Sequence, residues 1–170
     1  MALADDIITI VDSEDNVIGN KRASDLDNAK DIHRVSSVWI TNDKNELLMA
    51  QRAFTKRVFP GVWDVGVAGT VEKDQTYDEN AKKEAFEELG ITEPLAKGPK
   101  VRIEGEYNLF IQWYFLKLNK PADEFNFKKD EIVAVKWFSK AALLEGIKNQ
   151  PEKFLKNGQD MLRWIDMFWK

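Results

Sequence analysis

Apolar residues recur in short, β-rich runs along most of the chain, and these runs predict a sheet. The first two runs flank a turn-like segment at 13–16, so residues 7–22 are predicted to form an N-terminal hairpin. Further strands are predicted at 34–40, 47–50, 63–68, 101–106, 109–118 and 132–138. Two segments are predicted to be loops, 91–99 because it holds two prolines and 120–130 because it is charged.

Residues 76–89 carry the clearest helical periodicity in the sequence. Their apolar members fall on a single helical stripe: Tyr77, Ala81, Ala85 and Leu89. Thr76 and Glu79 have the spacing of a capping box, and Gly90 suits the left-handed position that ends many helices. Both ends of this helix are therefore marked in the sequence.

A second helical region is predicted towards the C-terminus. Ser139 is predicted to cap a helix at 140–147, and a helical region at 151–170 is predicted to break at Asn157 and Gly158. Strands interspersed with few helices indicate an α/β fold in which helices flank a mixed sheet. The length of 170 residues, without repeats or linkers, predicts a single domain over residues 1–170.

The composition narrows the classes of protein to which this chain can belong. Hydrophobic residues make up 44% of it, and 6 Trp, 3 Tyr and 10 Phe argue against intrinsic disorder. The net charge of -4 argues against duplex nucleic acid as a partner. No window reaches the roughly 18 apolar residues of a membrane span, and the N-terminus has no basic region typical of a signal peptide. We therefore expect no membrane partner and a cytoplasmic location.

The sequence contains no Cys and a single His, His33. This excludes disulfides, zinc–thiolate sites, iron–sulfur clusters, Cys nucleophiles and sites built from several histidines. His33 lies next to a predicted strand and is expected to be a structural or surface residue rather than a ligand. Carboxylates remain as candidate metal ligands.

Three glutamates lie together near the end of the predicted helix at 76–89. Glu84 and Glu88 are four residues apart at the edge of the apolar stripe, and Glu87 lies beside them. Like charges at this spacing repel, and a bound divalent cation would reverse the sign of that interaction. Carboxylate oxygens converging on one point suit Mg²⁺ or Mn²⁺. The alternative is a solvated face on which Lys83 pairs with Glu79 or Glu87.

The segment 69–91 closely resembles the Nudix box, whose pattern is G-x5-E-x7-R-E-U-x-E-E-x-G-U, with U a bulky or aliphatic residue. The matching positions are Gly69, Glu84, Glu87, Glu88, Gly90 and Ile91. Two positions depart from the pattern, since Gln75 stands where the family has Glu and Lys83 where it has Arg. The flanking segments 47–52, 59–64 and 130–138 also resemble the family, so the resemblance covers most of the chain.

The N-terminal hairpin and the segment around Trp63 are most similar to the isopentenyl-diphosphate-isomerase-like branch of this superfamily. True isomerases of that branch use a Cys immediately before the box glycine and several His ligands. Here Ala68 occupies the Cys position and Thr70 a His position. The resemblance is therefore to the hydrolases of that branch.

The resemblance implies an α/β/α Nudix sandwich with a mixed central sheet and an N-terminal β-hairpin. It also implies metal-dependent hydrolysis of a diphosphate linkage in a nucleoside diphosphate joined to another moiety. Glu84, Glu87 and Glu88 would be the metal-binding and catalytic carboxylates, with Mg²⁺ or Mn²⁺ as cofactor. The backbone carbonyl of Ala68 would add a metal ligand, and Lys83 would belong to the catalytic group.

Cationic and aromatic residues before the box are candidates for binding a small-molecule diphosphate. Arg52, Lys56 and Arg57 could hold phosphate groups, with a solvated basic loop as the alternative. Trp63 is the best candidate to line a pocket, although core packing is the more frequent role of such a residue.

The two departures from the box predict a weaker brace between the box loop and its helix. Gln75 and Lys83 could still form a hydrogen bond, but they lack the bidentate geometry of an Arg–carboxylate pair. We expect retained, reduced activity with weaker metal affinity. The alternative is a Nudix-fold binding module for a nucleotide or a protein partner. Phe168 and Trp169 either close the core or contribute to a homodimer contact.

Overall fold

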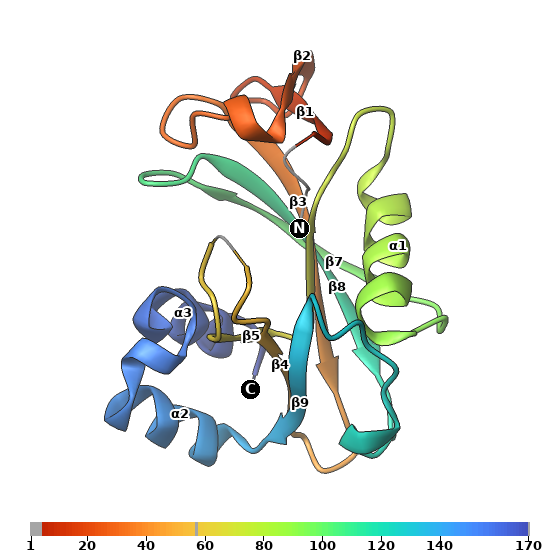
Figure 1. Ribbon diagram of the computed structural model, residues 1–170, viewed down its shortest axis with the longest axis vertical. Helices are drawn as coiled ribbons and strands as arrows, with labels where there is room; N and C mark the ends of the chain where they lie inside the picture. The colour runs from red at the N-terminus through yellow and green to blue at the C-terminus, as the bar shows by residue number, and fades with distance from the viewer. Residues whose placement is uncertain (1–4, 57, 170) are drawn as a thin grey trace. The chain divides into compact units, whose positions relative to one another are not determined.

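The computed structural model describes residues 5–56 and 58–169. Its strands and α-helices are, in chain order, β1 (Ile7–Val11), β2 (Val17–Arg22), β3 (Ile32–Thr41), β4 (Leu47–Arg52), β5 (Trp63–Val65), β6 (Val67–Thr70), α1 (Tyr77–Leu89), β7 (Ala96–Ile103), β8 (Leu109–Lys117), β9 (Ile132–Phe138), α2 (Lys140–Asn149) and α3 (Gln159–Phe168) (Figure 1). The described residues also form four short 3-10 segments: η1 (Ala23–Asp25), η2 (Ala122–Glu124), η3 (Pro151–Lys153) and η4 (Leu155–Gly158). This is the α/β class that the sequence predicts.

The described residues form two compact units. The first holds the residues up to 38 together with 68–86 and 91–115, and the second holds 39–67, 87–90 and the residues from 116 onwards. Strand β3 and helix α1 each contribute residues to both units. The single domain expected from the sequence stays a prediction.

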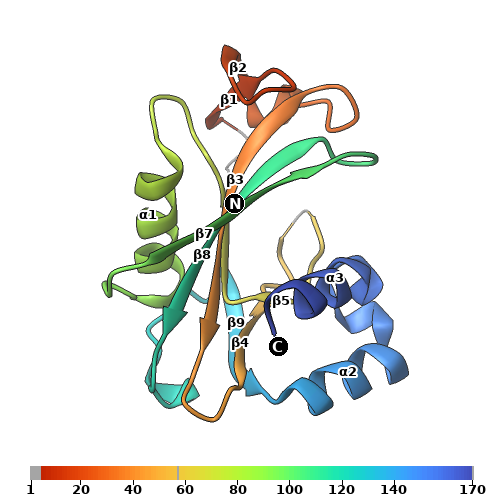
Figure 2. The same cartoon turned by 180° about the vertical axis from the view of Figure 1, so that it is seen from behind.

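The first unit is built on the N-terminal hairpin and the long strands that follow it. Strand β1 pairs antiparallel with β2 and with β3, and β7 pairs antiparallel with β8. The hairpin turn is closed by Asp12, whose carboxylate accepts hydrogen bonds from the backbone N–H groups of Glu14 and Asn16, both at 2.9 Å. Helix α1 lies alongside β7 and β8 (Figures 1 and 2), with Ala81 and Ala85 buried.

The second unit is centred on β4, which pairs antiparallel with β5 on one edge and β9 on the other. Its C-terminal region begins with Ser139, whose hydroxyl accepts a hydrogen bond from Ala142 N–H at 3.2 Å and so caps α2. The region ends with Trp169, which is 2% exposed, packs edge-on against Trp39 and donates from Nε1 to the carbonyl of Asn45 at 3.1 Å. Trp169 therefore closes this core, while a homodimer stays a prediction.

Two sequence predictions about strands are wrong. The segment 91–99 is not a loop throughout, because β7 already begins at Ala96. Gly98 and Pro99 lie where the register of β7 against β8 shifts. The side-chain amide of Gln112 donates to the Gly98 carbonyl there at 2.8 Å. A bulge tolerates a proline that regular pairing would exclude. The predicted strand 63–68 is divided into β5 and β6 at Gly66, where a Cβ would lie 3.1 Å from Ile40 Cδ1.

The remaining element predictions are confirmed to within a few residues. The helix at 76–89 is α1, the strand at 132–138 is β9, and the C-terminal break lies at Gly158, which has φ +77 and precedes α3. His33 is 5% exposed and pairs with Ile10 across β1 and β3, as a structural residue does. None of the helices in the described residues has both the length and the apolarity required to cross a bilayer.

Candidate active site

Helix α1, which carries the three glutamates, begins and ends as its sequence predicts. Thr76 Oγ1 accepts from Glu79 N–H at 3.2 Å, and the Glu79 carboxylate accepts from Thr76 N–H at 2.8 Å, which is a reciprocal capping box. These hydrogen bonds lower the pKa of Glu79 below its ordinary value. At the other end Gly90 adopts φ +65, and Ile91 N–H donates to the Ala85 carbonyl at 3.0 Å.

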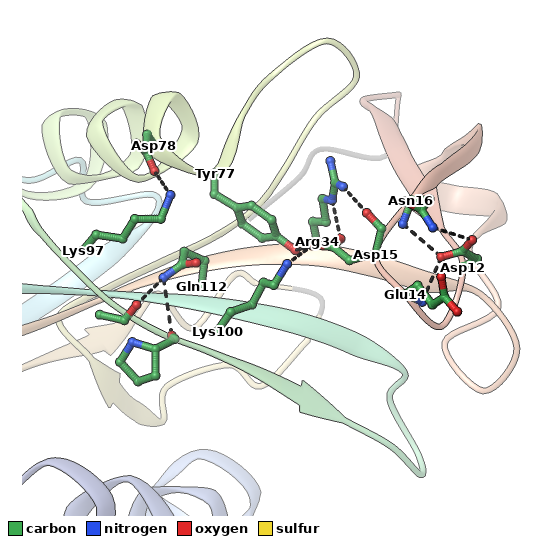
Figure 3. Close-up of polar contacts among 12 residues, drawn as sticks. Asp12, Glu14, Asp15, Asn16, Arg34, Tyr77, Asp78, Lys97, Lys100 and Gln112 are labelled. Carbon is green, nitrogen blue, oxygen red and sulfur yellow. Dashed lines mark hydrogen bonds and ion pairs between the residues drawn. The ribbon is translucent and has the colours of Figure 1, made fainter.

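The first residue of α1 is held by a network around one buried carboxylate (Figure 3). Asp15, whose side chain is 6% exposed, accepts from Arg34 Nε at 2.6 Å, Lys100 Nζ at 2.5 Å and the Tyr77 hydroxyl at 3.1 Å. Burial, followed by the neighbouring Asp15 charge, raises the pKa of Tyr77, so its hydroxyl stays a donor. The hairpin turn, β3 and β7 thereby fix the start of α1.

Two further residues in the first turn of α1, Asp78 and Asn80, are held by polar contacts within the first unit. Asp78 accepts hydrogen bonds from the Tyr114 hydroxyl and from Lys97 Nζ, and these contacts lower the pKa of Asp78. Asn80 is fully buried, and its amide donates to Ser36 Oγ at 2.6 Å and to the Gly69 carbonyl at 3.1 Å. Asn80 thus ties the helix to the glycine that opens the box loop.

Gly69 is required by the close approach of Glu84. A Cβ built on Gly69 would lie 2.3 Å from the carboxyl carbon of Glu84, a distance that real side chains do not tolerate. The Glu84 side chain therefore fills the space beside the Gly69 backbone, where it is 6% exposed. A charged group buried to this extent is costly in free energy unless it is compensated by hydrogen bonds, cations or a metal ion.

The other two carboxylates are more accessible than Glu84. Glu87 is exposed and Glu88 is half-buried, one turn further along the same helix. Within residues 5–56 and 58–169, no three His, Cys, Asp or Glu side chains are already gathered around one point. The donor set of α1 nevertheless fits Mg²⁺ or Mn²⁺, because it offers only hard carboxylate oxygens and one of them is buried beside a backbone cradle. Ala68, the candidate carbonyl ligand, precedes Gly69 in β6.

Lys83 forms an ion pair that the sequence did not predict. Its Nζ lies 2.5 Å from Glu72 Oε1, in the loop between β6 and α1. Gln75, at the position where the box pattern has Glu, has a buried Oε1 without a hydrogen-bond partner in the described residues. Glu72 was missed because no box position falls on it.

The candidate phosphate-binding residues are engaged within the second unit. Arg52 donates from Nε to the Phe59 carbonyl and from Nη2 to the Val58 carbonyl, both at 3.1 Å, which holds the loop that follows β4. Lys56 pairs with Glu131 in the segment before β9. Trp63 packs edge-on against Phe138, with 5.4 Å between the ring centroids, and is half-buried. The fourth candidate, Arg57, lies outside the described residues.

Asp64 is a titratable residue that the sequence analysis did not single out. It is half-buried on β5, where its Oδ1 accepts from Val65 N–H at 2.8 Å. Burial raises the pKa of Asp64 to about 6, and the charge of Arg52 opposes that shift only in part. The burial of Asp64 could not be predicted from the sequence, because it depends on how β5 packs.

Comparison with known proteins identifies the family. A family model for the NUDIX domain matches residues 31–164. A Nudix hydrolase of Streptomyces coelicolor is 39% identical over 54% of this chain, and the match spans about half (51%) of that relative. A prenyl-diphosphate phosphatase of Methanosarcina mazei is 27% identical over 87% of this chain and 88% of that protein. Isopentenyl-diphosphate Delta-isomerases are also among the relatives, which confirms the resemblance to that branch.

Solved structures confirm the fold. The crystal structure of a Deinococcus radiodurans protein superposes with a TM-score of 0.80 and 24% identity, covering 96% of this chain and 99% of that one. At this identity the likeness shows the fold alone. The family match extends over most of the chain and includes the whole box from Gly69 to Ile91. The chain therefore belongs to the NUDIX domain family.

Proposed function

We propose that this protein hydrolyses a diphosphate linkage, with Mg²⁺ or Mn²⁺ held by Glu84, Glu87 and Glu88. The observation that carries the proposal is the burial of Glu84 beside Gly69, at the box position where the family pattern has the glutamate that directly follows its arginine. Such a carboxylate is poorly solvated, and a divalent cation would compensate it. The accessible carboxylates of Glu87 and Glu88, on the same helix, would complete a ligand set that remains open to a substrate.

The proposal assigns roles to the residues that would bind the cation and to the contacts that hold α1. Glu84, Glu87 and Glu88 would bind the cation, and the Ala68 carbonyl would add an oxygen ligand. When bound, such a cation polarises the phosphoryl oxygens and lowers the pKa of coordinated water. The capping box and the Asp15 network keep α1 in place, so that the carboxylates are positioned before the substrate arrives.

The substrate class that we propose is a nucleoside diphosphate joined to another moiety. A prenyl-diphosphate phosphatase is among the relatives that match over most of both chains, so a prenyl diphosphate is the second class to be tested. Both classes share the diphosphate that the carboxylate-bound cation would hold. They differ in the group attached to it.

The test is metal-dependent product release from a panel of diphosphates. The panel holds nucleoside triphosphates, nucleotide sugars, dinucleotides and isoprenoid diphosphates, each with Mg²⁺, with Mn²⁺ and with chelator. Glu88→Gln is expected to lower kcat by about 100-fold or more, because several kcal/mol of metal-derived stabilisation are lost. Glu145→Gln is the matched control: it makes the same change at an exposed position of α2 and should leave turnover unchanged.

Two outcomes would contradict the proposal. Turnover that survives in chelator would show that the reaction does not need the cation. Absence of turnover on every panel member, together with absence of Mn²⁺ binding, would favour the alternative of a Nudix-fold binding module. Binding of a nucleotide without hydrolysis would then be its expected property.

A further inference from the structure

An ion pair joins the box loop to α1, and its lysine immediately precedes the buried glutamate. Lys83 Nζ and Glu72 Oε1 are 2.5 Å apart, and the two side chains are 32% and 29% exposed. A pair at this exposure adds little to global stability, about 0–1 kcal/mol. Its location is what distinguishes it, because Lys83 lies next to Glu84 and one turn before Glu87 and Glu88.

Glu72 is itself fixed to the first unit through its backbone. Its carbonyl accepts from Thr9 Oγ1 at 3.1 Å and from Gln75 N–H at 3.2 Å, and Glu72 forms a β-bridge with Ile8. The next residue, Lys73, donates from its N–H to the Ile7 carbonyl at 2.7 Å. The carboxylate that holds Lys83 is therefore anchored on β1, not on a freely moving loop.

We propose that Glu72 and Lys83 are positioning residues that set the orientation of the α1 turn carrying Glu84, and thereby the affinity for the divalent cation. The inference rests on the proposed function, since it assigns how that same site is held. It gives Glu72 a task that the box pattern does not assign to its position. It also explains how the site tolerates Gln75, whose buried Oε1 takes no part in holding Lys83.

An electrostatic role and a positioning role for Lys83 predict opposite changes in cation affinity when Lys83 is removed. A lysine close to three carboxylates repels a divalent cation, so its loss would tighten cation binding if charge alone mattered. If Lys83 acts by holding the helix turn against Glu72, its loss would weaken binding, as the loss of outer-shell partners of metal ligands usually does. The sign of the change therefore separates the two explanations.

The experiment measures Mn²⁺ affinity of the full chain by EPR of free Mn²⁺, without substrate. We compare the wild type with Lys83→Met, Glu72→Gln, the double variant, Lys83→Arg and, as matched control, Lys82→Met at the exposed neighbouring position. Lys83→Met and Glu72→Gln should each weaken Mn²⁺ binding by about tenfold. The double variant should be no weaker than the single ones, Lys83→Arg should restore binding, and Lys82→Met should bind as the wild type or slightly tighter.

A second readout needs no metal. Thermal unfolding of the same variants in chelator forms a double-mutant cycle, which should show a coupling between positions 72 and 83. Mn²⁺ binding by Lys83→Met at or above the wild-type affinity would overturn the inference, as would additive losses in the double variant. A wild type that binds no Mn²⁺ would instead overturn the proposed function, and the two failures are therefore distinguishable.

Discussion

The substitution Asp15→Asn tests whether one buried carboxylate holds the start of the box helix. Asp15 and Asp74 both adopt a left-handed backbone, with φ +67 and +64, and asparagine tolerates that conformation well. Asp15→Asn therefore changes the charge without straining the turn. Asp74, at 84% side-chain exposure, provides the matched control Asp74→Asn.

The expected loss in the free energy of unfolding follows from the three side chains that donate hydrogen bonds to Asp15. Arg34, with a side chain 17% exposed, loses a charge-assisted hydrogen bond at a cost of about 1.5–3 kcal/mol. Tyr77 loses or weakens a hydrogen bond worth about 1 kcal/mol. Lys100 is 42% exposed and can be solvated, so its share is about 0–1 kcal/mol. The free energy of unfolding should fall by about 3–4 kcal/mol, in the range for breaking one side of a buried ion pair.

The assay is thermal and urea unfolding of the two variants beside the wild type. For a chain of this length, 3–4 kcal/mol corresponds to a Tm lower by about 6–16 °C. Asp74→Asn should change Tm by no more than about 2 °C, because surface changes usually stay within about 0.5 kcal/mol. Equal shifts for the two variants would refute the assignment of Asp15 as the anchor of α1.

Two further predictions concern the cation site and the dependence of stability on pH. Gly69→Ala should weaken Mn²⁺ binding by about tenfold or more, because the added Cβ would displace the Glu84 carboxyl group. The control Gly19→Ala places its Cβ in open space and should leave the affinity unchanged. Equal Mn²⁺ affinities of the two variants in a titration would contradict the role of Gly69. Burial raises the pKa of Asp64 from 3.8 to about 6, so between these values the folded chain binds the extra proton and this contribution to stability falls as pH rises. Burial lowers the pKa of His33 from 6.5 to about 4, so its contribution rises with pH over nearly the same window. Asp64→Asn should therefore steepen the rise of unfolding free energy between pH 4 and 6.5, and a profile parallel to that of the wild type would show the assignment of Asp64 to be wrong.

Local signals made much of the fold predictable. The capping box at Thr76, the glycine after α1 and the serine before α2 each mark an element end through a short-range hydrogen bond or backbone conformation, and all three are observed. The start of β7 was not predictable in this way, because Pro99 is acceptable only at a register shift that the partner strand creates. The break between β5 and β6 at Gly66 likewise depends on close approach to Ile40, which is distant in the sequence and so leaves no local signal.

The candidate site was predictable where residue spacing along one helix determines it. Glu84, Glu87 and Glu88 follow from the spacing of the box, whereas the burial of Glu84 depends on its close approach to the Gly69 backbone. Glu72 could not be found from spacing, since it meets Lys83 only when the loop folds back onto α1. Arg52 donates to two carbonyls of its own loop, contacts that no spacing in the sequence indicates, and its binding of phosphate stays a prediction.

The most direct test of the central claim measures cation occupancy and turnover in the same titration and compares the two. Mn²⁺ occupancy by EPR and product release from the best panel substrate are measured together for the wild type and Glu84→Gln. The account predicts that the wild-type rate rises in parallel with occupancy, and that both curves move to at least tenfold higher Mn²⁺ concentration in Glu84→Gln. A Glu84→Gln protein that binds Mn²⁺ and turns over like the wild type would contradict it.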